Sequence, residues 1–278
     1  MKKNTQVKFK GDKEGYCNIC GQYGQLTRDH IPPQGCVKPT NVEIRTLTHY
    51  LSQPSGKPAN SQSGLNIRSI CGNCNNNLLG TEYDPVLIEV AKQVAGMVRV
   101  QQELGLSLPE KINLTIKPQR LLRSIVGHIL AGKLPIPREP PISAPFPDAL
   151  RNYFLNRSSN VPEKFEVYYW VYPSNKQIVA SSFSIGSAMG EGFIFSYLLK
   201  FFPLAFWIVE DKPDSFSIDL TKISKDKFKG LDETCEIVLD LRNIPSLDYP
   251  EVPGEGRYFM GCDDSTFLAQ PKKPKGFG

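Results

Sequence analysis

The 278-residue sequence has no run of 18 or more apolar residues, which excludes a helical segment that spans a membrane. No apolar stretch follows the lysines near its start, so we expect no secretory signal and a cytoplasmic location. Its seven cysteines, an odd number, argue against a disulfide framework and favour metal binding or free thiols. An apolar fraction of 40% and a charged fraction of 22% exclude disordered and fibrous proteins and leave one large globular domain or two smaller ones.

Residues 101–278 lack a charge excess of either sign. Residues 1–100 hold 12 Lys and Arg and 7 Asp and Glu, and subtracting these from the totals of 33 and 28 leaves 21 of each. The whole net charge of +5 therefore belongs to the first third of the chain. An anionic partner such as a nucleic acid is expected to dock there, although an excess of this size is also within the range of ordinary protein surfaces.

Four of the cysteines form two pairs with a two-residue spacer, Cys17 with Cys20 and Cys71 with Cys74. Each spacer lets a tight turn place both sulfur atoms on one ion, and four thiolates with no open position are typical of structural zinc. The sequence therefore predicts a zinc site made of these four residues.

Periodicity divides the rest of the chain into a helical and a strand-rich part. Apolar residues at helical spacing predict helices from Asp84 to Leu106, with Asp84 as N-cap, and from Pro118 to Ala131. Six prolines in residues 134–147 break regular structure and predict a linker. Aromatic and β-branched runs separated by turn residues predict strands in the remainder, at Phe165–Tyr172, Gln177–Phe183, Phe193–Phe202, Leu204–Glu210, Phe216–Leu220 and Cys235–Leu241.

Between the cysteine pairs lie Asp29-His30-Ile31-Pro32 and a segment, Leu65 to Ile70, that leads into the second pair and Asn75. In this order the motifs resemble the HNH, or His-Me finger, endonucleases, in particular the zinc-knuckle branch that includes phage Holliday-junction resolvase endonucleases. The resemblance covers roughly residues 15–85. It implies an α+β chain with a zinc-stabilised ββα-metal (treble-clef-like) finger, and a domain division into residues 1–83 (finger), 84–133 (helical segment), 134–147 (linker) and 148–278 (strand-rich α+β domain).

The resemblance also implies a role for each matching residue. His30 would be the general base that takes a proton from the attacking water, and Asn66 would brace the hairpin. Asp29 and Asn75 would hold one Mg²⁺ or Mn²⁺. Arg28 and Arg68 are candidate contacts to nucleic acid. This allocation is chemically reasonable, because a neutral imidazole accepts a proton near pH 7 and hard cations take oxygen ligands.

Several residues keep two interpretations. Residues 37–63 form an insertion with a polar surface loop at 52–64, and Lys38, Arg45, His49 and Lys57 either contact DNA or are merely solvated. Asn75, Asn76 and Asn77 are three candidates for one ligand position. Asp84 and Glu82 are candidates to complete the metal shell, and the alternative for Asp84, which we favour, is to cap the helix start. His128, on an apolar helix, is expected to be a packed or surface histidine and not a ligand.

The sequence thus predicts a metal-dependent DNA endonuclease with structural Zn²⁺ and catalytic Mg²⁺ or Mn²⁺. The alternative is a catalytically inactive, zinc-dependent nucleic-acid-binding protein. The two-part organisation also suggests an effector of bacterial or phage (antiviral) defence, in which residues 148–278 bind a regulatory ligand or protein and gate the nuclease. Homo-oligomerisation is a further possibility.

Overall fold

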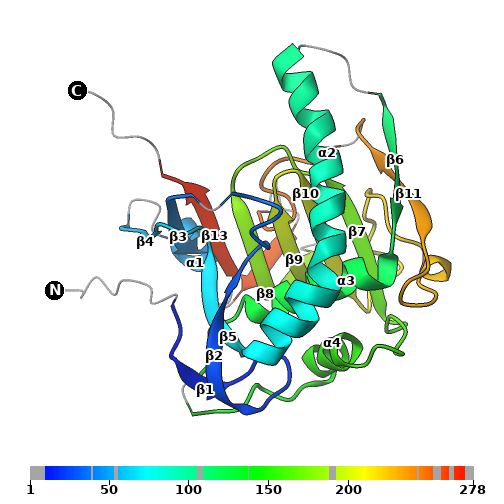
Figure 1. The fold of residues 1–278 in the computed structure, drawn as a ribbon. Helices are drawn as coiled ribbons and strands as arrows, with labels where there is room; N and C mark the ends of the chain where they lie inside the picture. Colours follow the sequence, from blue (N-terminus) through cyan, green and yellow to red (C-terminus); the bar gives the residue numbers. More distant parts are fainter. Residues whose placement is uncertain are drawn as a thin grey trace, which may run out of the picture.

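The structure is a computed structural model that describes residues 10–38, 40–52, 56–104, 109–136, 138–187, 192–242, 244–252, 258–262 and 266–272. These residues form a mixed α+β fold in which helices cover one face of a large sheet (Figure 1). The predicted α+β class is confirmed.

The large sheet is antiparallel and has the strand order β4-β3-β13-β8-β9-β10-β7, with β12 also paired to β8. Its strands are β3 (Val42–Thr46), β4 (Ala59–Ser61), β7 (Phe165–Val171), β8 (Gln177–Ser187), β9 (Phe193–Phe201), β10 (Leu204–Glu210), β12 (Tyr258–Cys262) and β13 (Thr266–Pro271). The predictions for 165–210 are confirmed. The strand predicted at 216–220 is wrong: Phe216 is buried against the sheet, but this segment packs without joining the ladder.

The insertion at 37–63 contains regular structure that the sequence analysis missed. Val42, Ile44 and Thr46 alternate with half-buried residues along β3, so one face of this short strand is apolar. β3 pairs with β13 near the C-terminus and with β4, which lies inside the predicted surface loop. A local sequence pattern cannot predict a pairing between strands so far apart in the chain.

The helices are α1 (Leu47–Ser52), α2 (Asp84–Leu104), α3 (Pro118–Ala131) and α4 (Pro145–Leu155), with a π-helical segment η1 (Asn73–Tyr83) and a 3₁₀ turn η2 (Lys225–Lys227). Both predicted long helices are confirmed, except that residues 105 and 106 of the first lie outside the described part. η1 runs directly into α2, so one continuous helical body begins at Asn73. Apolar residues of α2, α3 and α4 share one core with the inner face of the large sheet.

Two smaller sheets complete the fold. β1 (Glu14–Tyr16), β2 (Tyr23–His30) and β5 (Asn66–Cys71) form an antiparallel sheet in the order β1-β2-β5. β6 (Lys111–Ile116) pairs with β11 (Cys235–Asp240), the last of the predicted strands. The first of these sheets precedes η1 in sequence and lies beside it (Figure 1).

The proposed domain division stays a prediction. The described residues of 134–144 contain no helix or strand, and α4 begins inside the predicted linker at Pro145. One apolar core nevertheless contains Ile19 and Ile67 from the first third together with Leu199 and Phe267 from the second half.

Candidate metal centre and the polar cluster beside it

The four paired cysteines converge on one point. Cys17 and Cys20 lie in the turn between β1 and β2, Cys71 ends β5 and Cys74 lies in the first turn of η1. Their sulfur atoms all lie within 4.8 Å of one another. The turn is closed by the Gly21 amide, which donates to the Cys17 carbonyl at 2.9 Å. Gly21 has a φ of +72°, which glycine adopts without a steric penalty.

This cluster fits a structural zinc ion. With Zn–S bonds of about 2.3 Å, a tetrahedral site has S···S edges of about 3.8 Å. The Sγ atoms of Cys20 and Cys71 are 3.8 Å apart. A hydrogen bond from the Cys74 thiol, helped by backbone amides, lowers the pKa of Cys17 to about 5, so one thiolate forms readily. The cluster can therefore hold a metal ion such as zinc.

The knuckle that carries Cys17 and Cys20 is fastened to the C-terminal end of α3. The Asn18 amide donates to the carbonyls of Leu130 (3.2 Å) and Lys133 (2.6 Å), and the Ser69 hydroxyl donates to Ala131 (2.7 Å). The last carbonyls of a helix have no partner within the helix, so the bonds to Leu130 and Ala131 satisfy two of them. Arg151 of α4 in turn donates to the Asn18 carbonyl at 3.0 Å. The knuckle and the helical layer are thus held in one arrangement.

Asp29 and His30 end β2 and point to opposite faces of the small sheet, as successive strand residues do. His30 is half-buried, and the Gln34 amide nitrogen lies 2.9 Å from its Nε2. Partial burial lowers the pKa of His30 below its usual range, although the Asp29 charge opposes this. Asp29 is only 4% exposed and faces the helices.

The two asparagines lie next to this strand end. Asn66 pairs with His30 in the β2–β5 register, and its buried amide donates to Ser63 Oγ at 3.0 Å and to the Gly64 carbonyl at 3.2 Å, which ties down the connecting turn. The Asn75 amide donates to Thr27 Oγ1 (3.0 Å) and to the Arg28 carbonyl (2.9 Å). Asn77 instead bonds to Asn73 along the helix, so among the described contacts Asn75 is the member of the triplet tied to β2.

Asp29 has a partner that was not predicted from the sequence, His128. His128 of α3, expected to be a packed or a surface histidine, is fully buried. Its Nδ1 lies 2.8 Å from Asp29 Oδ2 and its Nε2 lies 3.0 Å from Asp84 Oδ1. Burial raises the pKa of Asp29, and the imidazole opposes this. Burial by itself lowers the pKa of His128, but the two carboxylates reverse the effect and raise it to about 10. A histidine on an apolar helix signals that a buried polar group needs partners, and the sequence does not reveal which.

The expected helix-start role of Asp84 is wrong. Asp84 has helical backbone angles and continues the body that begins in η1, so it does not cap a free helix end. Its carboxylate accepts from Ser124 Oγ at 2.7 Å and contacts His128. Glu82 forms an ion pair with Arg157 at 3.2 Å. Among the described contacts, neither side chain reaches β2.

Arg28 and Arg68 lie directly opposite each other on β2 and β5, on the face that also carries His30. Like charges in this position repel and destabilise a sheet. In the described part of the chain neither guanidinium has an acidic partner. Of the other candidate DNA contacts, Lys38 and Lys57 are exposed, whereas Arg45 lies half-buried on β3 and His49 half-buried on α1.

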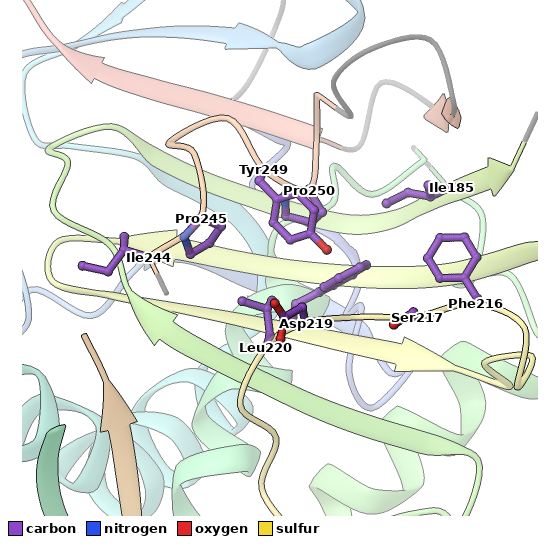
Figure 2. Close-up of a pocket in the computed structure, with 10 residues that line it drawn as sticks. Ile185, Phe216, Ser217, Asp219, Leu220, Ile244, Pro245, Tyr249 and Pro250 are labelled. Carbon is purple, nitrogen blue, oxygen red and sulfur yellow. The ribbon is translucent and has the colours of Figure 1, made fainter. Parts of the chain in front are cut away.

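A cavity of about 410 Å³ lies on the face of the large sheet that is turned away from α2, α3 and α4. Figure 2 shows Tyr249, Phe216 and Asp219 among its lining residues. Trp207 also lines it, and its indole Nε1 has no hydrogen-bond partner among the described residues. The cavity is large enough for a small ligand, and the regulatory ligand expected for residues 148–278 stays a prediction.

Comparisons with protein-family models, curated proteins and solved structures find no match to this chain. In the described ranges, every helix is too short or too polar to cross a bilayer. A function for this site is therefore inferred from its own geometry and chemistry.

Proposed function

We propose that this protein is a metal-dependent endonuclease that hydrolyses DNA phosphodiester bonds with a zinc-knuckle ββα-metal finger made of β2, β5 and η1. One observation carries the proposal. The Asn75 amide nitrogen bonds to β2 beside Asp29 and His30, while its Oδ1 accepts no hydrogen bond from the described residues. Asp29 Oδ1 likewise has no donor among them, because His128 contacts only Oδ2. Two oxygen ligands are thus left unused near the end of β2, the strand that also carries the candidate base.

The donor set suits a hard divalent cation. A carboxylate and an amide oxygen are ligands that Mg²⁺ and Mn²⁺ accept, with water and a substrate phosphate in the other positions. When bound, such an ion supplies stabilisation of negative charge on the phosphoryl oxygens and the leaving group. Asp29 and Asn75 would hold it, and His30 would take the proton of the attacking water. The four cysteines would hold Zn²⁺ and keep β2, β5 and η1 together.

The arginine pair supports a polyanionic substrate. Arg28 and Arg68 share a face with His30, and repulsion between them is relieved when a phosphate lies between the two guanidinium groups. This placement agrees with the positive charge of the first third of the chain.

We expect the wild-type protein to nick or cut plasmid DNA in Mg²⁺ or Mn²⁺, and His30→Ala to lose about 10²- to 10⁴-fold in rate because the general base is gone. Asn75→Ala should also lose cleavage, whereas Asn77→Ala, the same change two residues along the same helix, should cleave like wild type. Rates are read from gel-resolved time courses on zinc-loaded protein. Cleavage by His30→Ala at the wild-type rate would overturn the assignment.

The second candidate is a zinc-dependent nucleic-acid-binding protein without catalysis. The observation that favours it is the near-complete burial of Asp29, which has one oxygen already engaged by His128. Such a protein would retain DNA with a steep salt dependence but would not cleave it in any divalent metal. Arg68→Ala should weaken DNA binding and lower the salt slope by about one under either function, so the cleavage assay discriminates between them.

A further inference from the structure

His128 lies at the centre of a buried chain of hydrogen bonds that joins the end of β2 to the helices. Its Nδ1 contacts Asp29 Oδ2 at 2.8 Å and its Nε2 contacts Asp84 Oδ1 at 3.0 Å. Ser124 donates to the same Asp84 oxygen at 2.7 Å. His128 and Ser124 are one turn apart on α3, so a single helix supplies both side chains that contact the Asp84 carboxylate.

The orientation of the Asp29 carboxylate depends on this imidazole. A carboxylate that is 4% exposed needs hydrogen-bond donors, and the described residues offer one side-chain donor, on Oδ2. Fixing one oxygen fixes the plane of the group, and with it the direction of the unused Oδ1. Without the bond, the carboxylate could rotate about its Cβ–Cγ bond, and Oδ1 would lose its fixed direction.

The imidazole itself has little freedom. It is held at both nitrogens, and the helix that carries it packs closely on η1 and α4: a Cβ added at the neighbouring Gly127 would lie 2.5 Å from Leu79 and 2.6 Å from Phe154. The packing of the helices therefore fixes the position of His128. Its contact with Asp29, 99 residues earlier in the chain, in turn fixes the Asp29 carboxylate at the end of β2.

We propose that His128 is a positioning residue for the Asp29 carboxylate, which sets Asp29 Oδ1 to bind the divalent cation together with Asn75; this inference rests on the proposed function. Partners of this kind orient metal ligands in many proteins, and their loss typically lowers metal affinity about 10- to 100-fold. The finger would then bind its catalytic ion well only when it is docked on α3.

Two neutral variants of His128 separate positioning from simple packing. In His128→Asn the amide nitrogen takes the place of Nδ1 and still donates to Asp29. In His128→Gln it takes the place of Nε2 and donates to Asp84 instead. Each variant loses one bond and any charge on the imidazole, so both are expected to lower the unfolding temperature. Mn²⁺ binding is measured by electron paramagnetic resonance on the full-length, zinc-loaded protein without DNA, with Asp29→Asn as the reference for loss of the site.

We expect His128→Asn to bind Mn²⁺ within about threefold of wild type and His128→Gln to bind it about 10- to 100-fold more weakly. Equal Mn²⁺ affinity in the two variants would overturn the positioning role while leaving the nuclease proposal intact. If Asp29→Asn binds Mn²⁺ as wild type does, the metal site of the proposed function fails, and this inference fails with it. Should the His128 variants not fold, Asp84→Ala removes the acceptor of the His128 Nε2 contact; a loss of Mn²⁺ affinity then supports the role, and unchanged affinity overturns it.

Discussion

Glu210, at the end of β10, is a buried carboxyl group with no obvious compensation. It is 1% exposed, and its Oε2 has no hydrogen-bond partner among the described residues. Burial raises the pKa of Glu210 to about 7, with a further contribution from the neighbouring Asp211. In the folded protein this residue therefore keeps its proton well above the pH at which an unfolded chain releases it.

Glu210→Gln should stabilise the protein at pH 8 but not at pH 4. Because the folded pKa of Glu210 lies above the unfolded value of 4.5, stability is complete below about pH 4.5 and falls as the pH rises to about 7. The glutamine cannot ionise, so we expect a gain of about 2 to 3 kcal/mol in the free energy of unfolding at pH 8. Urea titrations at both pH values measure it, with the exposed Glu236→Gln on β11 as the control. An equal gain at both pH values would contradict the account.

Asp29 and His30 are adjacent in the sequence, but adjacency does not determine which other residues their side chains contact. The motif predicted that both residues act at one site, and strand geometry then sends their side chains to opposite faces of the sheet. Whether a residue from the helical layer meets Asp29 depends on how α3 packs. The sequence contained the polar residue, His128, but no signal for its partner.

Among the elements, α3 is a central helix that contacts η1, α2, α4 and the large sheet. Its apolar spacing predicted a helix, yet thirteen of its residues are buried, including Gln119, Arg123 and His128. The guanidinium of Arg123 donates to carbonyls after α4, such as that of Ser159 at 2.9 Å, while its Nε has no partner among the described residues. Arg123 also stacks on Tyr153 at 4.2 Å. A local pattern shows one apolar face, whereas burial on all sides follows from contacts with η1, α2, α4 and the large sheet.

Gly127→Ala should destabilise the protein even though alanine favours helices. The new methyl group would lie 2.5 Å from Leu79 and 2.6 Å from Phe154, and crowding of this kind costs about 1 to 3 kcal/mol. Gly96→Ala on α2 is the matched control, because no atom lies within 4 Å of its added Cβ, and it should stabilise by up to about 1 kcal/mol. Differential scanning calorimetry compares the two unfolding temperatures. A rise in both would show that α3 is less tightly packed than described.

At the scale of the whole molecule, β13 links a strand from the first third of the chain to a strand from its second half. It lies between β3 from the first third and β8 from the second half, and Phe267 and Ala269 are fully buried. The charge asymmetry and the proline-rich segment both suggested separable parts. The pairing of β13 with β3 crosses the predicted linker at 134–147, and amino-acid composition contains no information about such a contact.

Ending the chain before Thr266 should destabilise the whole protein, including the four-cysteine cluster. β3 and β8 would each lose a partner strand, and loss of a single buried phenylalanine already costs about 3 to 5 kcal/mol. We expect the truncated chain to lose cooperative unfolding by circular dichroism and to release zinc to a chelator faster. A chain that ends at Lys272, the last described residue, is the control. Independent folding of residues 1–83 would instead leave zinc release unchanged.

The sequence by itself determined the features whose cause is local. The spacing of two cysteine pairs defines a four-sulfur cluster, and apolar periodicity defines α2, α3 and the strands from Phe165 to Glu210. The tertiary structure alone decided that β3 pairs with β13, that Asp84 meets Ser124 and not a helix end, and that His128 holds Asp29. Each of these contacts joins segments far apart in the chain. Their geometry depends on how helices and sheets pack together, which no local spacing encodes.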